Sequence, residues 1–437
     1  MTNYRGISLM SVAAKLYNRM ILLRIRPFVD PHLRDNQAGF RPDRSCIDQT
    51  HIIRRIIEGA EAHQLPLVIT FIDFQKAFDS IDREMMFAIL RHYGIPCKMV
   101  EAIKSIYNHS ATCFRSRGGE LSDSFPVYLG VMQGDILAPY IFNIALDYPM
   151  KNATKHHGFI THKRRSTLFP ERKLPDLDFA DDIALLDDSI TNAQQHLNDV
   201  TSECLKVGLR INDSKTKYTK YNIDTNTPLT TNGILLESTN NFTYLGWMTK
   251  NTECDIERRK VLGTAAYNKL HNIWNSHHIP TELKIEIFKV AVIPIFLYGC
   301  EAWNLTEASK HTINTFQTTT LRHILHIQQA YDHITNQELL HRAKTTPLTL
   351  QIEKRQLSKT GHRLRKPEHS LSNIYALYEP THGHRKPGRP KPSFANNIAT
   401  IIDPITKPTE TQIRIHAANR DQWREIVKNH STDNIQP

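Results

Sequence analysis

The sequence predicts an α+β fold, in which a part that mixes strands and helices is followed by a part that is mostly helical. Residues 66–220 combine continuous apolar runs, which are typical of buried strands, with apolar residues at helical spacing. Residues 253–345 repeat apolar residues three and four positions apart, as amphipathic helices do. With 437 residues, of which 40% are hydrophobic, the chain can bury a sizeable core.

The first 65 residues are predicted to be helical, apart from a loop that reads DPHLRDNQAGFRPDRSC (30–46). Lys15 and Arg19 interrupt the apolar stretch near the N-terminus, which indicates an amphipathic helix with a basic face rather than a signal peptide. The apolar residues at helical spacing are Leu9, Val12, Ala13, Leu16, Tyr17 and Met20. No stretch reaches the roughly 18 apolar residues that a membrane span needs.

Asp73 follows a continuous apolar run, Leu67–Ile72, which predicts a buried strand. Ser80 or Asp82 can cap the helix that comes next, and Gly94 can end it. The aspartate therefore lies between a buried strand and the turn into a helix, where α/β sheets place functional groups. Taken alone, Asp73 is better explained as an aspartate that ends a strand and caps a turn.

The stretch LPDLDFADDIALL (174–186) predicts a β-hairpin with two carboxylates, Asp181 and Asp182, at its tip. Apolar residues alternate with aspartates in its first strand, ADDI can form a tight turn, and an apolar run returns as the second strand. Because side chains alternate between the faces of a strand, Asp176 and Asp178 are expected to face solvent. Taken alone, the tip is compatible with a plain polar turn.

Considered together, the two stretches favour a metal site. If both strands are neighbours in one sheet, Asp73, Asp181 and Asp182 converge, and clustered carboxylates repel each other unless a cation compensates them. Oxygen ligands without histidine or cysteine select Mg²⁺ or Mn²⁺. Two such ions about 4 Å apart can activate a 3′-hydroxyl and stabilise a phosphoryl group in transfer.

The same stretches resemble motifs of the reverse transcriptases of non-LTR (LINE-like) retrotransposons. FIDFQKAFD (71–79) resembles the first catalytic motif of that family, and FADD (179–182) resembles its (Y/F)xDD motif. Five further stretches resemble other motifs, in the family's order along the chain: NYRGISL, QAGFRPDRS, GVMQGDILAPYIFNI (with Ala138 where serine is usual), GLRINDSKTK and YLG. LYGCEAW and HGHRKPGRP resemble segments that follow the polymerase in such elements.

The resemblance implies a right-hand polymerase of α+β class, with fingers, palm and thumb and a helical, basic C-terminal extension. The fingers would occupy 1–66, shortened at the N-terminus because the chain begins two residues before NYRGISL. The palm, with an interleaved fingers segment, would occupy 67–250, and the helical thumb 251–345. The basic C-terminal region, 346–437, is expected to be partly disordered.

Catalytic roles follow from the resemblance. Asp73 and Asp181 would hold two Mg²⁺ or Mn²⁺ ions with the backbone carbonyl of Phe74, and Asp182 would support them. Phe78 lies five residues after Asp73, where the family places a bulky residue that clashes with a ribose 2′-hydroxyl; a core phenylalanine is the alternative.

Five further residues would bind the nucleotide: Gln133, Gly134, Arg41, Lys15 and Lys215. Gln133 and Gly134 would line the pocket, although a plain turn glycine is common. Arg41 would clamp the triphosphate, and Lys15 would contact it, unless it is a solvated lysine. Lys215 would protonate the leaving pyrophosphate, with a surface lysine as the alternative.

Two segments would contact primer and template. Tyr244, Leu245 and Gly246 would form a hairpin against the primer backbone, although core packing explains them as well. Arg385, Lys386 and Arg389 lie in HGHRKPGRPKP, which echoes the Gly-Arg-Pro core of minor-groove AT-hooks and also has the composition of a flexible basic linker.

The charge of the chain agrees with a polyanionic partner, since the net charge is +11. The implied partners are an RNA template, a DNA primer or target and dNTPs, with no membrane. The six cysteines are far apart and form no CxxC pair, which argues against a zinc knuckle and suits a reducing compartment. His156, His157, His277 and His278 are expected at the surface. The location is expected to be intracellular, and nuclear in an intact element.

The sequence therefore predicts an RNA-directed DNA polymerase that extends a DNA 3′ end along an RNA template. One alternative is a palm polymerase that copies RNA into RNA, against which FADD and Phe78 count. Another is a non-catalytic, basic nucleic-acid-binding remnant of a retroelement.

Overall fold

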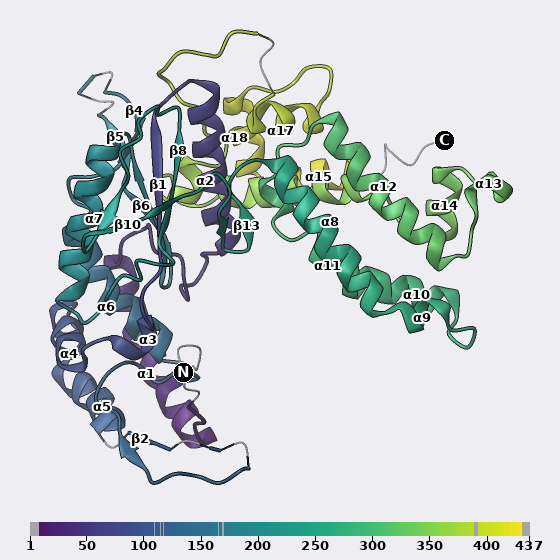
Figure 1. Ribbon diagram of the computed structural model, residues 1–437. Helices are drawn as coiled ribbons and strands as arrows, with labels where there is room; N and C mark the ends of the chain where they lie inside the picture. Colours follow the sequence, from purple (N-terminus) through teal and green to yellow (C-terminus); the bar gives the residue numbers. More distant parts are fainter. Residues whose placement is uncertain are drawn as a thin grey trace. The chain divides into compact units, whose positions relative to one another are not determined.

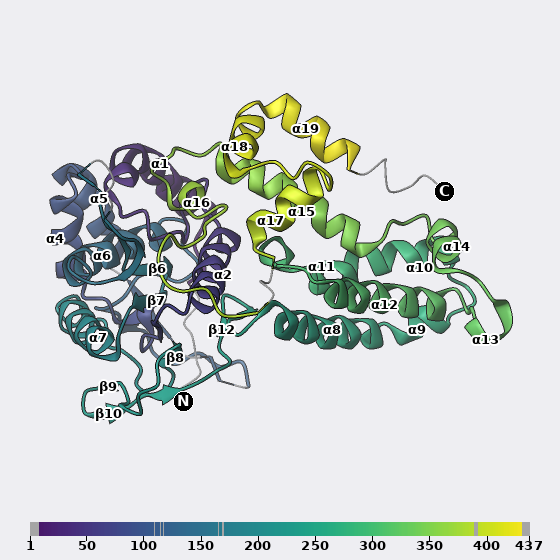
Figure 2. The same ribbon diagram turned by 90° about the horizontal axis from the view of Figure 1, so that it is seen from above.

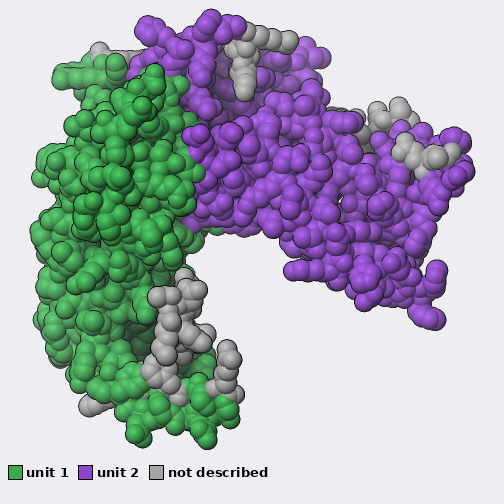
Figure 3. Space-filling model, viewed as in Figure 1, with its two compact units in different colours: residues 1–49, 65–239 green, residues 50–64, 240–437 purple. Residues whose placement is uncertain are grey.

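The computed structural model describes residues 8–108, 110–113, 115–116, 118–164, 166–167, 170–388 and 392–430. The chain divides into two compact units (Figure 3), of which the first comprises 1–49 and 65–239 and the second 50–64 and 240–437. The division near 240 lies ten residues before the predicted end of the palm. Residues 346–437 belong to the same unit as the preceding helices rather than to a unit of their own.

A five-stranded sheet forms the centre of the first unit (Figure 1), with the strand order β11-β8-β1-β7-β6. Strand β1 lies in the middle, antiparallel to both of its neighbours, and all six of its residues are buried. The continuous apolar run therefore forms the buried strand that the sequence predicts. The strands are β1 (Leu67–Ile72), β6 (Asp176–Phe179), β7 (Asp182–Asp187), β8 (Lys217–Tyr221) and β11 (Glu237–Ser238).

Helices pack on this sheet through one continuous apolar core, and α7 contacts both β1 and β7. Helix α4 starts as expected, because the side chain of Asp82 accepts a hydrogen bond from the amide of Met85. It ends at Tyr93, and Gly94 follows in the left-handed conformation. The helices are α4 (Arg83–His92), α5 (Cys97–Asn108), α6 (Ala138–Ala153) and α7 (Ile190–Leu205).

Helix α1 (Val12–Val29) has the predicted helical form, but a different face is buried. Most of the apolar residues whose spacing predicts the helix are exposed, among them Leu16, Tyr17 and Met20. The apolar residues that reach the core lie further along, and include Ile21 and Leu22. The spacing thus predicts the helix correctly, but it does not identify the packed side.

The second unit is mostly helical, as predicted. Two short strands, β12 (Thr243–Tyr244) and β13 (Trp247–Met248), form a hairpin near the start of its longer segment, 240–437. Helix α8 (Thr252–Lys269) contacts both α11 (Ile293–Phe296) and α12 (Glu307–Ile324), and the three lie side by side in Figure 2. The remaining longer helices are α15 (Leu348–Leu364), α17 (Phe394–Ile402), α18 (Glu410–Ala418) and α19 (Arg420–Asn429).

The last helices of this unit are packed around a core of their own. Trp423 on α19 is buried, and its indole N–H donates to the carbonyl of Leu357 on α15 at 2.9 Å. Both parts together confirm the α+β class and the helical C-terminal region. Among the described residues, no helix combines the length and the apolar character needed to cross a membrane.

Candidate active site

The strand register brings the predicted catalytic aspartates to the same end of two neighbouring strands, β1 and β7. Strands β1 and β7 run antiparallel, and Ile72 pairs with Ile183. Asp73 follows Ile72 and Asp182 precedes Ile183, so the next position of the register sets the two aspartates opposite each other. Paired positions on neighbouring strands place their Cβ atoms about 5 Å apart. The two predicted strands are therefore neighbours in one sheet, as the sequence predicts, and the shared site of Asp73, Asp181 and Asp182 stays a prediction.

Asp181 lies in the two-residue turn of the hairpin, since Phe179 pairs with Asp182. The first turn residue, Ala180, has φ +57° and is buried. A left-handed backbone is unfavourable for residues other than glycine, by about 1–2 kcal/mol. Asp181 is half-buried and Asp182 is exposed, so both carboxylates at the tip of the hairpin are accessible. The left-handed conformation of Ala180 has to be maintained by the residues around it.

The segment after α7 holds the backbone of Asp73 from the other side. The amide of Asn212 donates to the carbonyl of Asp73 at 2.8 Å, and the amide of Asp73 donates to Thr216 Oγ1 at 3.3 Å. Lys215 Nζ lies 3.8 Å from Asp73 Oδ1. Phe74 is buried and bridges to Ile211. The predicted site residues Asp73 and Lys215, 142 positions apart, are thus neighbours.

The loop before α6 is anchored where a nucleotide pocket is predicted. Gln133 Nε2 donates to Asp79 Oδ1 at 2.7 Å, which links the loop to the turn after β1. Gly134 has φ +103°, and a Cβ there would lie 2.6 Å from the carbonyl oxygen of Ser8. Only glycine fits this position, because both the conformation and the close backbone approach exclude a side chain.

Phe78 is half-buried, and its ring stacks on that of Phe142 with centroids 4.3 Å apart. One face of the ring belongs to the core while part of the side chain stays accessible, so the structure is compatible with both readings of this residue. Lys15 is exposed on α1, one turn before Asn18, whose amide donates to Asp135 in the loop after Gly134.

Arg41 does not have the position expected of a triphosphate clamp. Its side chain is only 1% exposed and forms five hydrogen bonds, to the carboxylate and carbonyl of Asp30 and to the carbonyls of Arg34 and Gln37. A guanidinium has five N–H donors, so none remains for a phosphate in this arrangement. We therefore correct its assignment: Arg41 stabilises the loop that contains QAGFR.

Asp176 and Asp178 are fully buried, which corrects the expectation that they face solvent. Arg34 donates to Asp176 Oδ2 at 2.5 Å and to Asp178 Oδ2 at 2.7 Å, and it contacts Asp147 Oδ1 at 3.3 Å. Burial and the neighbouring carboxylate of Asp176 raise the pKa of Asp178 well above its usual value, although Arg34 opposes this. We call Arg34, Asp147, Asp176 and Asp178 the Arg34 cluster.

The second unit contains the predicted hairpin of residues 243–248. Leu245 and Gly246 form its turn, both with positive φ, and their carbonyls accept hydrogen bonds from Tyr298 and from Arg258 and Arg259. Tyr244 is buried, which favours core packing for this residue, whereas Leu245 and Gly246 are half-exposed.

The basic segment predicted to contact nucleic acid is partly described. Arg385 and Lys386 have exposed side chains, and Arg385 lies 3.9 Å from Glu379. The backbone amide of Lys386 donates to the carbonyl of Ala62 at 3.2 Å, so this part of the segment is attached to the end of α2 (Cys46–Ala62). Arg389 lies outside the described residues.

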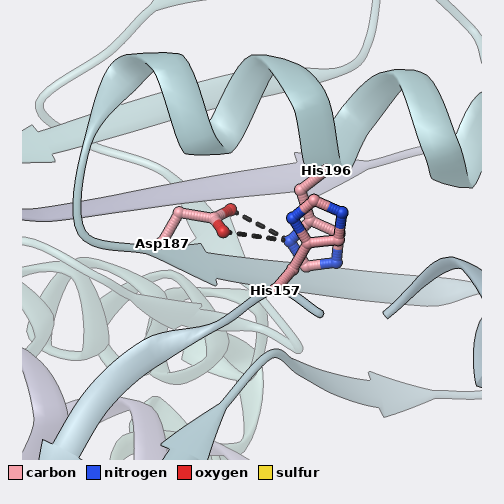
Figure 4. A group of neighbouring side chains, drawn as sticks. All are labelled: His157, Asp187 and His196. Atoms are coloured by element: carbon pink, nitrogen blue, oxygen red, sulfur yellow. Dashed lines mark hydrogen bonds and ion pairs between the residues drawn. The ribbon is translucent and has the colours of Figure 1, made fainter. Parts of the chain in front are cut away.

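A second group of metal-ligating side chains lies at the other end of β7 (Figure 4). One ligand atom from each of His157, Asp187 and His196 lies within 4.8 Å of the others. The two imidazole rings are stacked, with centroids 4.4 Å apart and planes 7° apart. His196 Nδ1 lies 3.0 Å from Asp187, and His157 Nε2 lies 2.7 Å from Asp199.

The histidine stack differs in its ligand chemistry from the carboxylates at the ends of β1 and β7. The nitrogen lone pairs of stacked rings lie in separate, parallel planes and therefore do not meet at one ion, and nitrogen ligands select transition metals rather than Mg²⁺. Asp182 and Asp187 are the first and last residues of β7, five positions or about 17 Å apart. His157 is half-buried rather than at the surface as expected, whereas His156, His277 and His278 are exposed.

Comparison with known proteins agrees with this geometry. Residues 1–249, more than half of the chain, match the family described as reverse transcriptase (RNA-dependent DNA polymerase). The chain belongs to this family. Membership agrees with the right-hand polymerase fold that the motifs imply, and the matched region contains the whole sheet edge and the loops around it.

The relatives of this family member are proteins of non-LTR retrotransposons. It is 26% identical over 342 residues to the probable RNA-directed DNA polymerase from transposon BS of Drosophila melanogaster, covering 74% of this chain and 36% of that protein. It is 28% identical over 218 residues to the Pol polyprotein of the element R2DM from the same organism, covering 49% of this chain and 19% of that protein. The chain thus spans about a third or less of these relatives.

Solved structures of telomerases are also similar. Apo telomerase from Candida Tropicalis matches 83% of this chain and 60% of that chain, with a TM-score of 0.40 and 13% identity. Telomerase from Candida albicans in complex with a telomeric RNA fragment matches 79% of this chain and 55% of that chain, with a TM-score of 0.37 and 12% identity.

Proposed function

We propose that the chain is an RNA-directed DNA polymerase that adds dNTPs to a DNA 3′ end on an RNA template. The observation that carries the proposal is the register of β1 and β7, which brings Asp73 opposite Asp182 and next to the turn residue Asp181. Family membership supports the same reaction. The RNA template, the DNA primer and the dNTPs are the partners that this reaction requires.

The residues at the edge suit two Mg²⁺ or Mn²⁺ ions, because the donors are carboxylate and carbonyl oxygens. Asp73, Asp181 and the carbonyl of Phe74 would hold them, with Asp182 adjacent. When bound, such ions activate the primer 3′-hydroxyl and stabilise the attacking and leaving oxygens of the displacement. Lys215, whose Nζ lies 3.8 Å from Asp73 Oδ1, would donate a proton to pyrophosphate as it leaves.

Other residues would bind and select the substrates. Phe78 would exclude the ribose 2′-hydroxyl with its accessible edge, and Gln133 and Gly134 would border the nucleotide. The turn at Leu245 and Gly246 would contact the primer, and Arg385 and Lys386 would contact phosphates, so binding should weaken with salt. In an intact element this activity would take place at nicked chromosomal DNA, in the nucleus.

Primer extension on an RNA template tests the proposal, with dNTPs and NTPs compared for the wild type and Asp181→Asn. The proposal predicts dNTP incorporation in Mg²⁺ that Asp181→Asn abolishes. RNA binding without incorporation would instead favour a nucleic-acid-binding remnant. Preferential use of NTPs would favour an RNA-copying polymerase.

A further inference from the structure

A segment of the QAGFR loop extends the sheet beyond β6. Gln37 bridges to Asp178 in parallel orientation, the amide of Ala38 donates to the carbonyl of Asp178 at 2.9 Å, and the amide of Asp178 donates to Asn36 at 3.0 Å. The edge of the catalytic hairpin is therefore covered by residues about 140 positions away in the sequence.

The side-chain amide of Gln37 forms hydrogen bonds with both the backbone N–H and the backbone carbonyl of the turn residue Ala180. Gln37 Oε1 accepts a hydrogen bond from the amide of Ala180 at 2.7 Å, and Gln37 Nε2 donates to the carbonyl of Ala180 at 3.1 Å. Oε1 also accepts from the amide of Gly39 at 2.8 Å. Gln37 is 2% exposed, so water does not compete for these bonds.

The backbone of Gly39 closes on the same turn. A Cβ at Gly39 would lie 2.3 Å from the nitrogen of Ala180, closer than real contacts allow. The Asn143 side chain on α6 in turn donates to the carbonyl of Gly39. Ala180 is thus held in its unfavourable left-handed conformation between a side-chain amide and a glycine backbone, directly before Asp181.

We propose that Gln37 is a positioning residue for nucleotidyl transfer. By fixing Ala180 at positive φ, its amide sets the direction in which Asp181 leaves the turn, and therefore where its carboxylate meets the metal ions. The inference rests on the proposed polymerase function. Because the residue acts through the backbone of Ala180, its loss should lower the rate of the chemical step rather than the affinity for dNTPs.

Gln37→Leu removes both polar atoms at similar volume, and Gln49→Leu is the matched control. Gln49 is also 2% exposed, but its amide donates to the carbonyls of Asn36 and Asp178, before the turn. We expect Gln37→Leu to lower kcat in Mg²⁺ by about tenfold or more, with KM for dNTP nearly unchanged. Gln49→Leu should lower kcat much less at a similar loss of stability.

A rescue variant separates positioning from general stability. Glycine adopts positive φ without the cost that alanine carries, so Ala180→Gly should restore much of kcat to Gln37→Leu and none to Gln49→Leu. Equal kcat for the two leucine variants, or no rescue by Ala180→Gly, would overturn the proposal.

Amide hydrogen exchange provides a readout that does not need activity. In Gln37→Leu, the peptide that contains Ala180 and Asp181 should exchange faster than in Gln49→Leu, because the amide of Ala180 loses its acceptor. If the wild type extended no primer, the polymerase function would fail, while exchange would still decide whether Gln37 holds the turn. Unchanged exchange would refute the clamp itself.

Discussion

The hairpin of β6 and β7 contains two pairs of aspartates that have opposite environments. Asp181 and Asp182, at the tip, are half-buried and exposed, at an edge where ions and substrates can approach. Asp176 and Asp178, a few residues earlier, are fully buried and bind Arg34. The comparison indicates that acidic side chains in one short motif can serve two purposes: we propose metal binding for the pair at the tip, whereas the buried pair attaches the hairpin to the loop that contains Arg34.

The largest expected effect comes from removing the cation of the buried pair. Arg34→Met should destabilise the protein by about 3–5 kcal/mol, because the carboxylates of Asp147, Asp176 and Asp178 would lose the charge that compensates them. Urea unfolding measures the loss. Arg44→Met is the control, since the partly exposed Arg44–Asp35 pair should contribute less than about 1 kcal/mol. Similar losses in both variants would contradict the role of the Arg34 cluster.

A smaller effect is expected at Phe78, whose ring packs in the core on one face and is partly accessible to solvent. Phe78→Ala should lower the preference for dNTPs over NTPs by about tenfold, because the ring edge that excludes a 2′-hydroxyl is lost. Its stacking on Phe142 predicts some loss of stability as well. Relative kcat/KM values for the two nucleotides measure the selectivity. A stability loss without any change in selectivity would make Phe78 a core residue alone.

The smallest effect concerns the proton of the buried pair. Burial, together with the charge of Asp176, raises the pKa of Asp178 in the folded protein, so the folded state retains a proton that the unfolded state releases above about pH 4. This contribution to stability is complete below the unfolded pKa and is lost as pH rises through the folded pKa. Asp178→Asn imitates the protonated group and removes that dependence.

The stability of Asp178→Asn relative to the wild type should therefore increase as pH rises above the unfolded pKa of about 4, until it passes the raised pKa of Asp178 in the folded protein. Unfolding free energies from urea titrations at several pH values measure the difference. Parallel curves for the two proteins would show that Asp178 is ionised throughout, with Arg34 as a sufficient partner.

The sequence predicts correctly those features that depend on local pattern. The run Leu67–Ile72 is a buried strand, and FADD is the tip of a hairpin, because strand periodicity and turn preference are written in neighbouring residues. The alternation that places Asp176 and Asp178 on one face is also local. The residue that covers that face cannot be predicted from the local pattern, because Arg34 lies more than 140 positions earlier in the chain.

The same limit explains the remaining differences. Helix α1 has the predicted periodicity, but tertiary packing selects Ile21 and Leu22 rather than Leu16 as its buried side. Arg41 has the sequence context of a phosphate ligand, yet Asp30 and two backbone carbonyls occupy its guanidinium. Gln37 lies in a stretch that resembles a family motif, but its positioning role is not predicted, because that role depends on the conformation of Ala180, which the sequence does not reveal.

The division of the hairpin into catalytic and supporting aspartates is tested most directly by single-nucleotide incorporation in saturating Mg²⁺, with Asp181→Asn and Asp178→Asn compared. We expect Asp181→Asn to slow incorporation by about a thousandfold while leaving the unfolding free energy nearly unchanged. Asp178→Asn should keep the rate within about threefold of the wild type. Equal losses in the two variants, or activity retained by Asp181→Asn, would contradict the account.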